Sequence, residues 1–472
     1  MATAQQHLDV LSALDSAFLA QEDERSHLHV GGVAIFAGPA PDLDDVLEHI
    51  RLRLDRVPRY RQKIAFPPGG LARPHWVDDP TFHLGYHVRH EALPSPGGDA
   101  ELRRVVARAF SHRLDRSKPL WELILVEGLR DDRFAIISKT HHAVVDGYAG
   151  VDLMSALLDL DPKPANDPVA APWMARPEPS PAELVAASLS GGLRDAVALP
   201  ARALATLAPA RLRALVDGAN EAALAVFRPA PDSPLNVRIG PHRRAWFVEA
   251  PLADLKRVKN AFGGTVNDVV LALVTGALRQ WLHTRGLRTE GTELRAGVPV
   301  SIRGADEHDS GGNRISQLVA TLPVDIADPV ARLNAIQESM HVLTGARQAV
   351  AAEEIGGVSD FAPPTILAQS SRQVFSTRPY NLRVTNVPGP QVPLYLRGHE
   401  LEQVFPLSFL TGDRALAIAV MSYNGKASFG LIADYDELTD LDVIADGIST
   451  SLAEYVKLAA RREKRGRPAK TR

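Results

Sequence analysis

A proline-rich stretch divides this chain into two blocks. It runs from Pro162 to Pro181, and the next segment, Ala182–Phe227, is rich in alanine and leucine. Proline has no backbone N–H and a fixed φ, so a stretch of this kind connects domains more readily than it joins a sheet. At 472 residues the chain also exceeds what one hydrophobic core usually supports. We therefore expect two domains joined by helical arms.

Both blocks show short strand-like and longer helix-like patterns, which indicate α/β domains with mixed sheets. The first block predicts strands at residues 30–36 and 134–140 and an amphipathic helix at 43–54. The second predicts a helix at 265–285 and strands at 295–302, 317–322, 415–423 and 426–433. The pair Asn424-Gly425 between the last two strands is a strong signal for a type I′ turn.

The predicted boundaries follow these patterns. We expect domains at residues 1–161 and 244–457, a helical linker at 162–243 and a disordered basic tail at 458–472. In the linker, Leu212, Leu215 and Val216 could form the apolar face of a membrane-surface anchor, but packing on a core is the more common use of such a face. The tail resembles an AT-hook core, and a solvated basic end is the more common explanation.

Composition excludes several kinds of chemistry. The chain has no cysteine, so disulfides, thiolate metal sites and cysteine nucleophiles are excluded. A formal charge of −3 indicates no bulk attraction for nucleic acid. The first 15 residues do not resemble a signal peptide and no apolar run is long enough to span a bilayer, so we expect a cytoplasmic protein.

One string of residues predicts a catalytic site. His141-His142 follows the buried strand 134–140 directly, and Asp146-Gly147 comes after three more residues, before an expected helix. A side chain at the end of a rigid strand can reach a cleft. Histidine can accept and return a proton near neutral pH, because its unperturbed pKa is about 6.5. The string therefore predicts a general base that activates a hydroxyl group.

The sequence lacks the motifs of several other enzyme families. The sequence has no Gly-x-Ser-x-Gly elbow, Walker loop or Gly-x-Gly-x-x-Gly fingerprint, which argues against serine hydrolases and nucleotide-binding enzymes. His83, His87 and His90 could suggest a metal cluster. However, residues 82–88 alternate like a half-buried strand, with His83 and His87 on the solvent side and His90 on the other face. We therefore predict no metal site.

The histidine string and several other motifs together resemble the bacterial wax ester synthase/diacylglycerol acyltransferase family. The matching segments lie along almost the whole chain and in the family's order. They are Leu14-Asp15-Ser16-Ala17-Phe18, Pro119-Leu120-Trp121-Glu122, the histidine string, Asn267-Asp268, Asn386-Val387-Pro388-Gly389-Pro390, Met421-Ser422-Tyr423 and Ser428-Phe429-Gly430.

The resemblance implies a chloramphenicol-acetyltransferase-like fold, in which two α/β domains enclose a cleft or tunnel. It implies that His142 is the general base, with His141 supporting the loop and Gly147 forming the turn. Asp146 would brace that loop through an arginine, for which we expect Arg303. His142 would take the proton of an alcohol that attacks the thioester of acyl-CoA, with no acyl-enzyme and no cofactor besides acyl-CoA as co-substrate.

The oxyanion formed in such a reaction needs hydrogen-bond donors. Asn267 and Asp268, at the start of the helix 265–285, are candidates, although Asn267 could equally cap that helix. The expected cleft wall is formed by Pro119, Leu120, Trp121, Asn386, Pro388 and Gly389.

The expected acceptor is diacylglycerol or a long-chain alcohol, and the sequence does not distinguish the two. Because both are lipids, we expect peripheral contact with the inner membrane or with lipid inclusions. Two alternatives stay open: a condensation-type or polyketide acyltransferase, since condensation domains share the histidine string, and a lipid-binding protein of the same fold without turnover.

Overall fold

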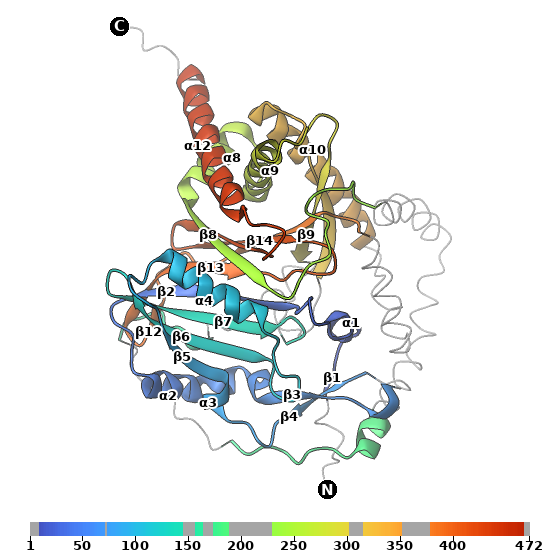
Figure 1. The fold of residues 1–472 in the computed structure, drawn as a ribbon, viewed down its shortest axis with the longest axis vertical. Helices are drawn as coiled ribbons and strands as arrows, with labels where there is room; N and C mark the ends of the chain where they lie inside the picture. Colours follow the sequence, from blue (N-terminus) through green and yellow to red (C-terminus); the bar gives the residue numbers. More distant parts are fainter. Residues whose placement is uncertain are drawn as a thin grey trace.

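The computed structural model describes residues 9–70, 73–144, 156–163, 173–187, 229–301, 315–351 and 378–466. In this part the chain forms two six-stranded mixed sheets and one three-stranded sheet, flanked by helices (Figure 1). The prediction of an α/β fold built around mixed sheets is confirmed.

The N-terminal sheet has the strand order β12-β13-β2-β7-β6-β5. Its strands are β2 (His29–Ala37), β5 (Val88–Ala92), β6 (Trp121–Leu129), β7 (Arg133–His141), β12 (Tyr395–Leu396) and β13 (His399–Leu407). Helix α2 (Leu43–Arg53) packs on one face, where Phe36 and Phe134 point, and α4 (Asp99–Ser111) packs on the face that carries Ile35 and Ile137. Strand β7 is therefore buried on both sides, as its nearly continuous apolar sequence predicts.

Three short strands and two short helices also belong to the described part of this half. Strands β1 (Asp9–Val10), β4 (His75–Asp78) and β3 (Gln62–Ala65) form the small sheet, in that order. The helices are α1 (Ala13–Gln21) and α3 (Leu84–His87). The half-buried strand predicted at residues 82–88 is wrong, because residues 84–87 form the helical turn α3 and the strand starts only at Val88.

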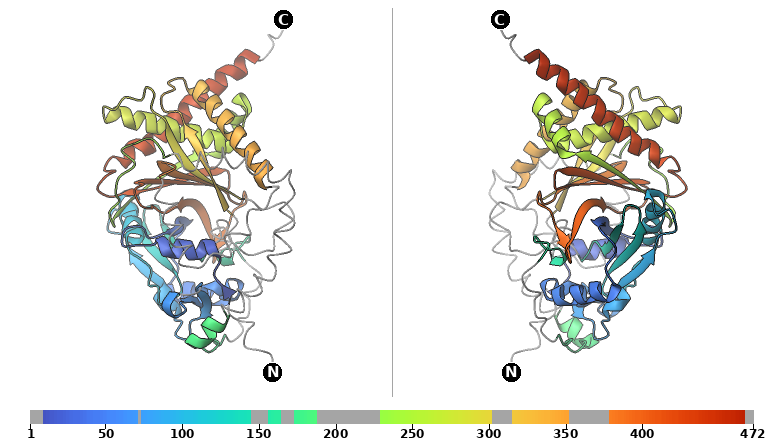
Figure 2. Two further views of the ribbon diagram at one scale, coloured as in Figure 1. Left: turned by 90° about the vertical axis from the view of Figure 1, so that its right-hand side faces the viewer. Right: turned by 90° about the vertical axis from the view of Figure 1, so that its left-hand side faces the viewer.

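The C-terminal sheet has the order β10-β9-β11-β14-β15-β8. Its strands are β8 (Arg243–Pro251), β9 (Leu294–Ser301), β10 (Ile315–Leu322), β11 (Leu382–Pro388), β14 (Leu416–Tyr423) and β15 (Lys426–Asp434). Helices α8 (Leu252–Phe262), α9 (Val266–Thr284), α10 (Pro329–Ala351) and α12 (Leu441–Gly466) cover the face that points away from the other sheet (Figures 1 and 2). The turn between β14 and β15 has positive φ at both central residues, 42° at Asn424 and 81° at Gly425, as predicted.

The two halves interlock through β13. This strand lies beyond residue 244, yet it pairs with β2 in the N-terminal sheet. It also packs against the C-terminal sheet, where an ideal Cβ on Gly430 would lie 1.8 Å from the Pro406 carbonyl oxygen, so only glycine permits this approach. The predicted domains, 1–161 and 244–457, place β13 in the second domain and so did not anticipate its pairing with the first. Their exact boundaries stay predictions.

The prediction that the tail is disordered from residue 458 is wrong for residues 458–466. Helix α12 continues to Gly466, because Ala459 is buried and Glu463 forms an ion pair with Arg257 at 2.7 Å. The AT-hook-like residues beyond 466 and the possible anchor at 212–216 lie outside the described residues.

No single described helix is long and apolar enough to cross a membrane. The bent pair α8 and α9 meets that requirement only by length and composition, and α9 is largely buried inside the protein.

Candidate active site

The loop that carries His142 is held by main-chain hydrogen bonds on two sides. Strand β7 ends at His141, whose N–H donates to the Leu120 carbonyl at 3.0 Å. The N–H of His142 donates to the Leu28 carbonyl at 3.0 Å, just before β2. Because β2 and β6 flank β7 in the sheet, the backbone at His142 is fixed by the strands themselves.

The imidazole of His142 contacts two phenylalanine rings from opposite halves of the chain. Its centroid is 4.3 Å from that of Phe18 in α1 and 5.3 Å from that of Phe409, which follows β13. The residue is only 8% exposed. Burial, and after it the charge of Arg383, lowers the pKa of His142 to about 3, so the ring is neutral at physiological pH.

The two ring nitrogens of His142 have different surroundings. Nδ1 is buried and has no hydrogen-bond partner from another residue, while the main chain of His142 itself favours the protonated ring. We infer that Nε2 is the nitrogen that can meet a substrate. A neutral imidazole with a free nitrogen is the form that a general base requires.

Arg383 was not among the residues that the sequence indicated. It lies on β11, is 9% exposed, and places its guanidinium carbon 4.2 Å from the ring centroid of Phe409. The same phenylalanine therefore contacts His142 and Arg383. Only the position of Arg383 three residues before Asn386, in a motif of the family, could have drawn attention to it.

His141 faces a buried polar cluster instead of Phe409. Its Nδ1 accepts a hydrogen bond from the Ala143 N–H at 3.1 Å, and its Nε2 lies 3.9 Å from the Glu22 carboxylate. Glu22 also lies 3.6 Å from His29 and binds Arg116 through a hydrogen bond of 2.6 Å. Burial lowers the pKa of His141 to about 3. These contacts tie His141 to its loop, and its supporting role stays a prediction.

Asn267 and Asp268, both predicted as site residues at the start of α9, make different contacts in the structure. The helix is capped by Thr265 and Asp268, whose carboxylate accepts from the Thr265 N–H at 2.7 Å. The alternative that Asn267 caps the helix is therefore wrong. The Asn267 side chain instead accepts a hydrogen bond of 3.5 Å from Asn386, so the structure brings together two residues that are 119 positions apart.

Three of the predicted cleft residues precede or begin β6. Trp121 is 2% exposed, donates from its indole N–H to the Tyr60 carbonyl at 2.8 Å, and stacks on His87 with 4.6 Å between ring centroids. Leu120 is buried beside Ala143 in a small apolar cluster, and Pro119 precedes it. Glu122 binds the buried Lys139 at 2.8 Å and thereby fastens β6 to β7.

The other cleft candidates lie at the end of β11. Pro388 is the last residue of that strand, and Gly389 packs so closely that an ideal Cβ would lie 2.4 Å from the Ser422 carbonyl oxygen. No described contact links Pro388 or Gly389 to His142. Asp146, Gly147 and Arg303 lie outside the described residues, so their predicted roles stay predictions.

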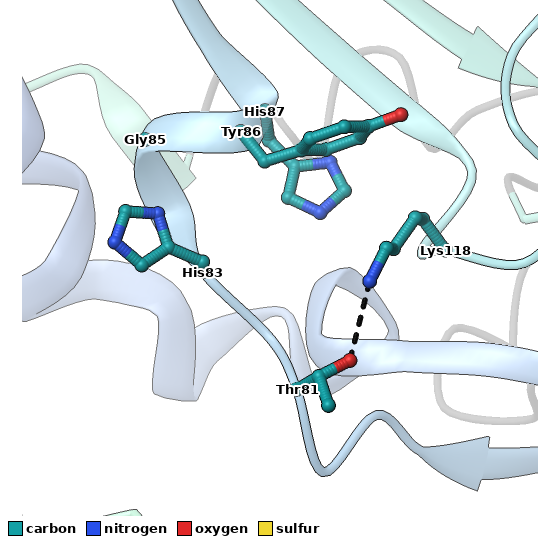
Figure 3. A pocket seen from close by; sticks show the side chains of 6 residues that line it. All are labelled: Thr81, His83, Gly85, Tyr86, His87 and Lys118. Atoms are coloured by element: carbon teal, nitrogen blue, oxygen red, sulfur yellow. Dashed lines mark hydrogen bonds between the residues drawn. The ribbon is translucent and has the colours of Figure 1, made fainter.

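A surface pocket of about 390 Å³ lies at the edge of the N-terminal sheet (Figure 3). Its lining residues are Thr81, His83, Gly85, Tyr86, His87 and Lys118. His83 is exposed, but His87 is buried, which contradicts the predicted solvent-side position of both. The described residues contain no group of three or more His, Asp or Glu side chains placed to hold a metal ion.

Solved structures with similar folds define the class. A wax ester synthase/diacylglycerol acyltransferase from Marinobacter aquaeolei VT8 matches with a TM-score of 0.69 and 28% identity over 96% of this chain and 100% of that one. The first condensation domain of the calcium-dependent antibiotic synthetase matches with a TM-score of 0.61 over 97% of each chain, at 17% identity, which shows the fold alone. The chain thus has the two-domain fold shared by these acyltransferases and condensation domains.

Sequence comparison identifies the family within that class. The catalytic-domain model of wax ester synthase/diacylglycerol acyltransferase matches residues 11–270, and the family's C-terminal domain matches residues 311–455. A protein of Mycobacterium tuberculosis named as a diacylglycerol O-acyltransferase is 34% identical over 96% of this chain and 97% of its own length. The chain belongs to the wax ester synthase/diacylglycerol acyltransferase family, as the sequence motifs indicated.

Proposed function

We propose that this protein transfers an acyl group from acyl-CoA to the hydroxyl of a lipophilic alcohol, either diacylglycerol or a long-chain alcohol, with His142 as the general base. The observation that carries the proposal is the state of His142 at the end of a central strand: the residue is buried, its ring is neutral, and its buried Nδ1 has no partner from another residue, which leaves Nε2 to meet the substrate. The names of the relatives support both kinds of acceptor.

Each step of this reaction uses a group that the site provides. His142 removes the proton from the alcohol while its oxygen attacks the thioester carbonyl. The tetrahedral intermediate then expels the thiolate, which receives the proton from His142. The chain has no cysteine, and the base acts directly on the acceptor alcohol, so we propose that no acyl group is bound to the protein.

The surroundings of His142 favour a lipid acceptor. Phe18 and Phe409 contact its ring on two sides, and such an apolar lining suits an alkyl chain better than a peptide amine. The family match across both halves of the chain also favours lipid esterification over peptide condensation. We further propose that the protein acts in the cytoplasm and collects its substrates at the inner membrane or at the surface of lipid inclusions.

The test is release of free thiol from palmitoyl-CoA with hexadecanol or dioleoylglycerol as acceptor. We expect acceptor-dependent release, and a loss of roughly two to four powers of ten in kcat/KM for His142→Ala, because general-base help is worth that much. The matched control is His87→Ala, which removes another buried histidine of the same domain.

Three results would contradict the proposal in different ways. Thiol release that His142→Ala leaves intact would mean that another group is the base. A palmitoyl adduct in the intact mass of the protein after incubation with palmitoyl-CoA alone would reveal an acyl-enzyme. Binding of palmitoyl-CoA without turnover by either acceptor would favour the lipid-binding alternative.

A further inference from the structure

We propose that Arg383 is a second catalytic residue, whose guanidinium binds the negative charge that develops on the thioester oxygen near His142. This inference rests on the proposed acyl transfer and names a group that neither the sequence motifs nor the relatives assign.

The side chain of Arg383 points to the face of β11 that lies opposite helix α9. Strand β11 lies inside the C-terminal sheet, between β9 and β14, so its backbone is held on both sides. Val384 packs into the core that contains α9, and Asn386, on the same face of the strand, reaches Asn267 of that helix. Alternate residues of a strand face opposite ways, so Arg383 points to the other side, where Phe409 and His142 lie.

Arg383 is a buried cation that has no anionic partner in the part of the chain that the structure describes. Its one described hydrogen bond is to the Tyr380 hydroxyl at 3.4 Å, and it forms no ion pair with a described carboxylate. By contrast the buried Arg53 binds Asp159 at 3.1 Å. A buried charge without a partner is costly. A negative charge supplied by the reaction would compensate for that cost.

Acyl transfer produces the negative charge that Arg383 would bind. When the alcohol oxygen bonds to the thioester carbon, one electron pair of the C=O bond moves onto oxygen, and His142 takes the hydroxyl proton. Arg383 holds the resulting oxyanion. When the carbonyl forms again, the C–S bond breaks with its electron pair on sulfur, and His142 returns the proton to that sulfur. A preorganised donor at the oxyanion favours the transition state over the ground state.

The charge of Arg383 also affects His142. The charged and titratable groups that surround the histidine in the described part are Arg383 from β11 and His141 from its own loop, with Glu22 and His29 behind His141. Of these, Arg383 is the charge that lowers the pKa of His142, second to burial. Loss of Arg383 should therefore raise that pKa and move the acid limb of the pH–rate profile to higher pH.

The experiment compares Arg383→Gln, Arg383→Lys and Arg414→Gln in the palmitoyl-CoA assay. Arg414 is the matched control, because it is also buried and its guanidinium stacks 4.3 Å from the Tyr380 ring centroid, but it does not contribute to the pKa shift of His142. We expect kcat to fall roughly 10²-fold in Arg383→Gln, the loss typical of one oxyanion donor, with KM little changed. Arg383→Lys, which keeps the charge, should recover part of the rate.

Several outcomes would overturn the proposal. These are a wild-type kcat and pH profile in Arg383→Gln, equal losses in Arg383→Gln and Arg414→Gln, or a higher KM for palmitoyl-CoA with unchanged kcat, which would indicate ground-state binding. If Arg383→Gln fails to fold, Arg383→Lys decides through its kcat, because lysine keeps the charge but not the guanidinium group. A reduced kcat with unchanged KM supports the proposal, and a wild-type kcat would contradict it. Activity that survives in His142→Ala would instead contradict the proposed function.

Discussion

Two buried histidines lie near the same end of the strands in the N-terminal sheet, and both contact aromatic rings, three for His87 and two for His142. His87, just before β5, is stacked nearly flat between Phe82 and Trp121, and its Nδ1 bonds to the Trp121 carbonyl at 2.9 Å. His142, just after β7, is tilted against Phe18 and nearly perpendicular to Phe409, and its Nδ1 has no hydrogen-bond partner from another residue. Burial lowers the pKa of both.

The difference shows that burial alone does not distinguish the proposed catalytic histidine from a structural one. The ring of His87 is fixed by stacking and by a main-chain hydrogen bond, as expected of a structural residue. The Nδ1 atom of His142 has no hydrogen-bond partner from another residue, and the charge of Arg383, which forms no ion pair with a described carboxylate, acts on the ring. Buried polar groups without partners are uncommon, and function is one reason to keep them.

The largest effect on stability is expected at Trp121, which stacks on His87. Trp121→Ala should lower the free energy of unfolding by about 3–5 kcal/mol, because a buried tryptophan is replaced by a cavity. Urea denaturation would measure the loss, with Trp246→Ala as the control, since Trp246 is only partly buried. Unchanged stability with an altered preference for acyl chain or acceptor would instead support the predicted cleft role of Trp121.

A smaller effect is expected from acid. His141 and His142 have a pKa of about 3 in the folded protein against 6.5 for an ordinary histidine, so only the unfolded chain gains their protons as the pH falls from 6.5 towards 3. Their contribution to stability is present above pH 6.5 and decreases below it. At pH 5.5 the protonation of each histidine in the unfolded chain should lower the free energy of unfolding by about 1.4 kcal/mol.

This acid effect can be measured by urea denaturation at pH 7.5 and pH 5.5. The stability loss should be smaller in His142→Gln than in the wild type, since glutamine does not titrate. An equal loss in both proteins would mean that His142 does not stay neutral in the folded state. That result would weaken the interpretation of His142 as a neutral general base.

The smallest effect concerns the start of α9. Asp268→Ala should cost about 1 kcal/mol of stability, because it removes a capping residue, and should leave kcat unchanged. Asn267→Ala, at the preceding position, is the control that keeps the cap. If kcat for Asp268→Ala falls by more than the loss of folded protein explains, the prediction is contradicted. Asp268 would then have a catalytic contact that the structure does not show.

Much of the fold was predictable because its signals are local. The strand 134–140, the helix 265–285 and the turn at Asn424-Gly425 follow from hydrophobic periodicity and backbone preferences. The prediction for residues 82–88 was wrong, because a short alternating pattern does not distinguish a strand from a helical turn that tertiary contacts stabilise. The tail prediction failed for a similar reason, since Ala459 and Glu463 find partners elsewhere in the fold.

The sequence by itself determined the family, the α/β architecture and the choice of His142, since these depend on ordered motifs and on the position of a histidine after a buried strand. Only the tertiary structure placed β13 beside β2 and brought Phe18, Phe409 and Arg383 to the same histidine. Arg383 and His142 are far apart along the chain, and their juxtaposition depends on the pairing and packing of two sheets. No local pattern encodes such long-range packing, so the electrostatic partner of the proposed base could be found only in the folded protein.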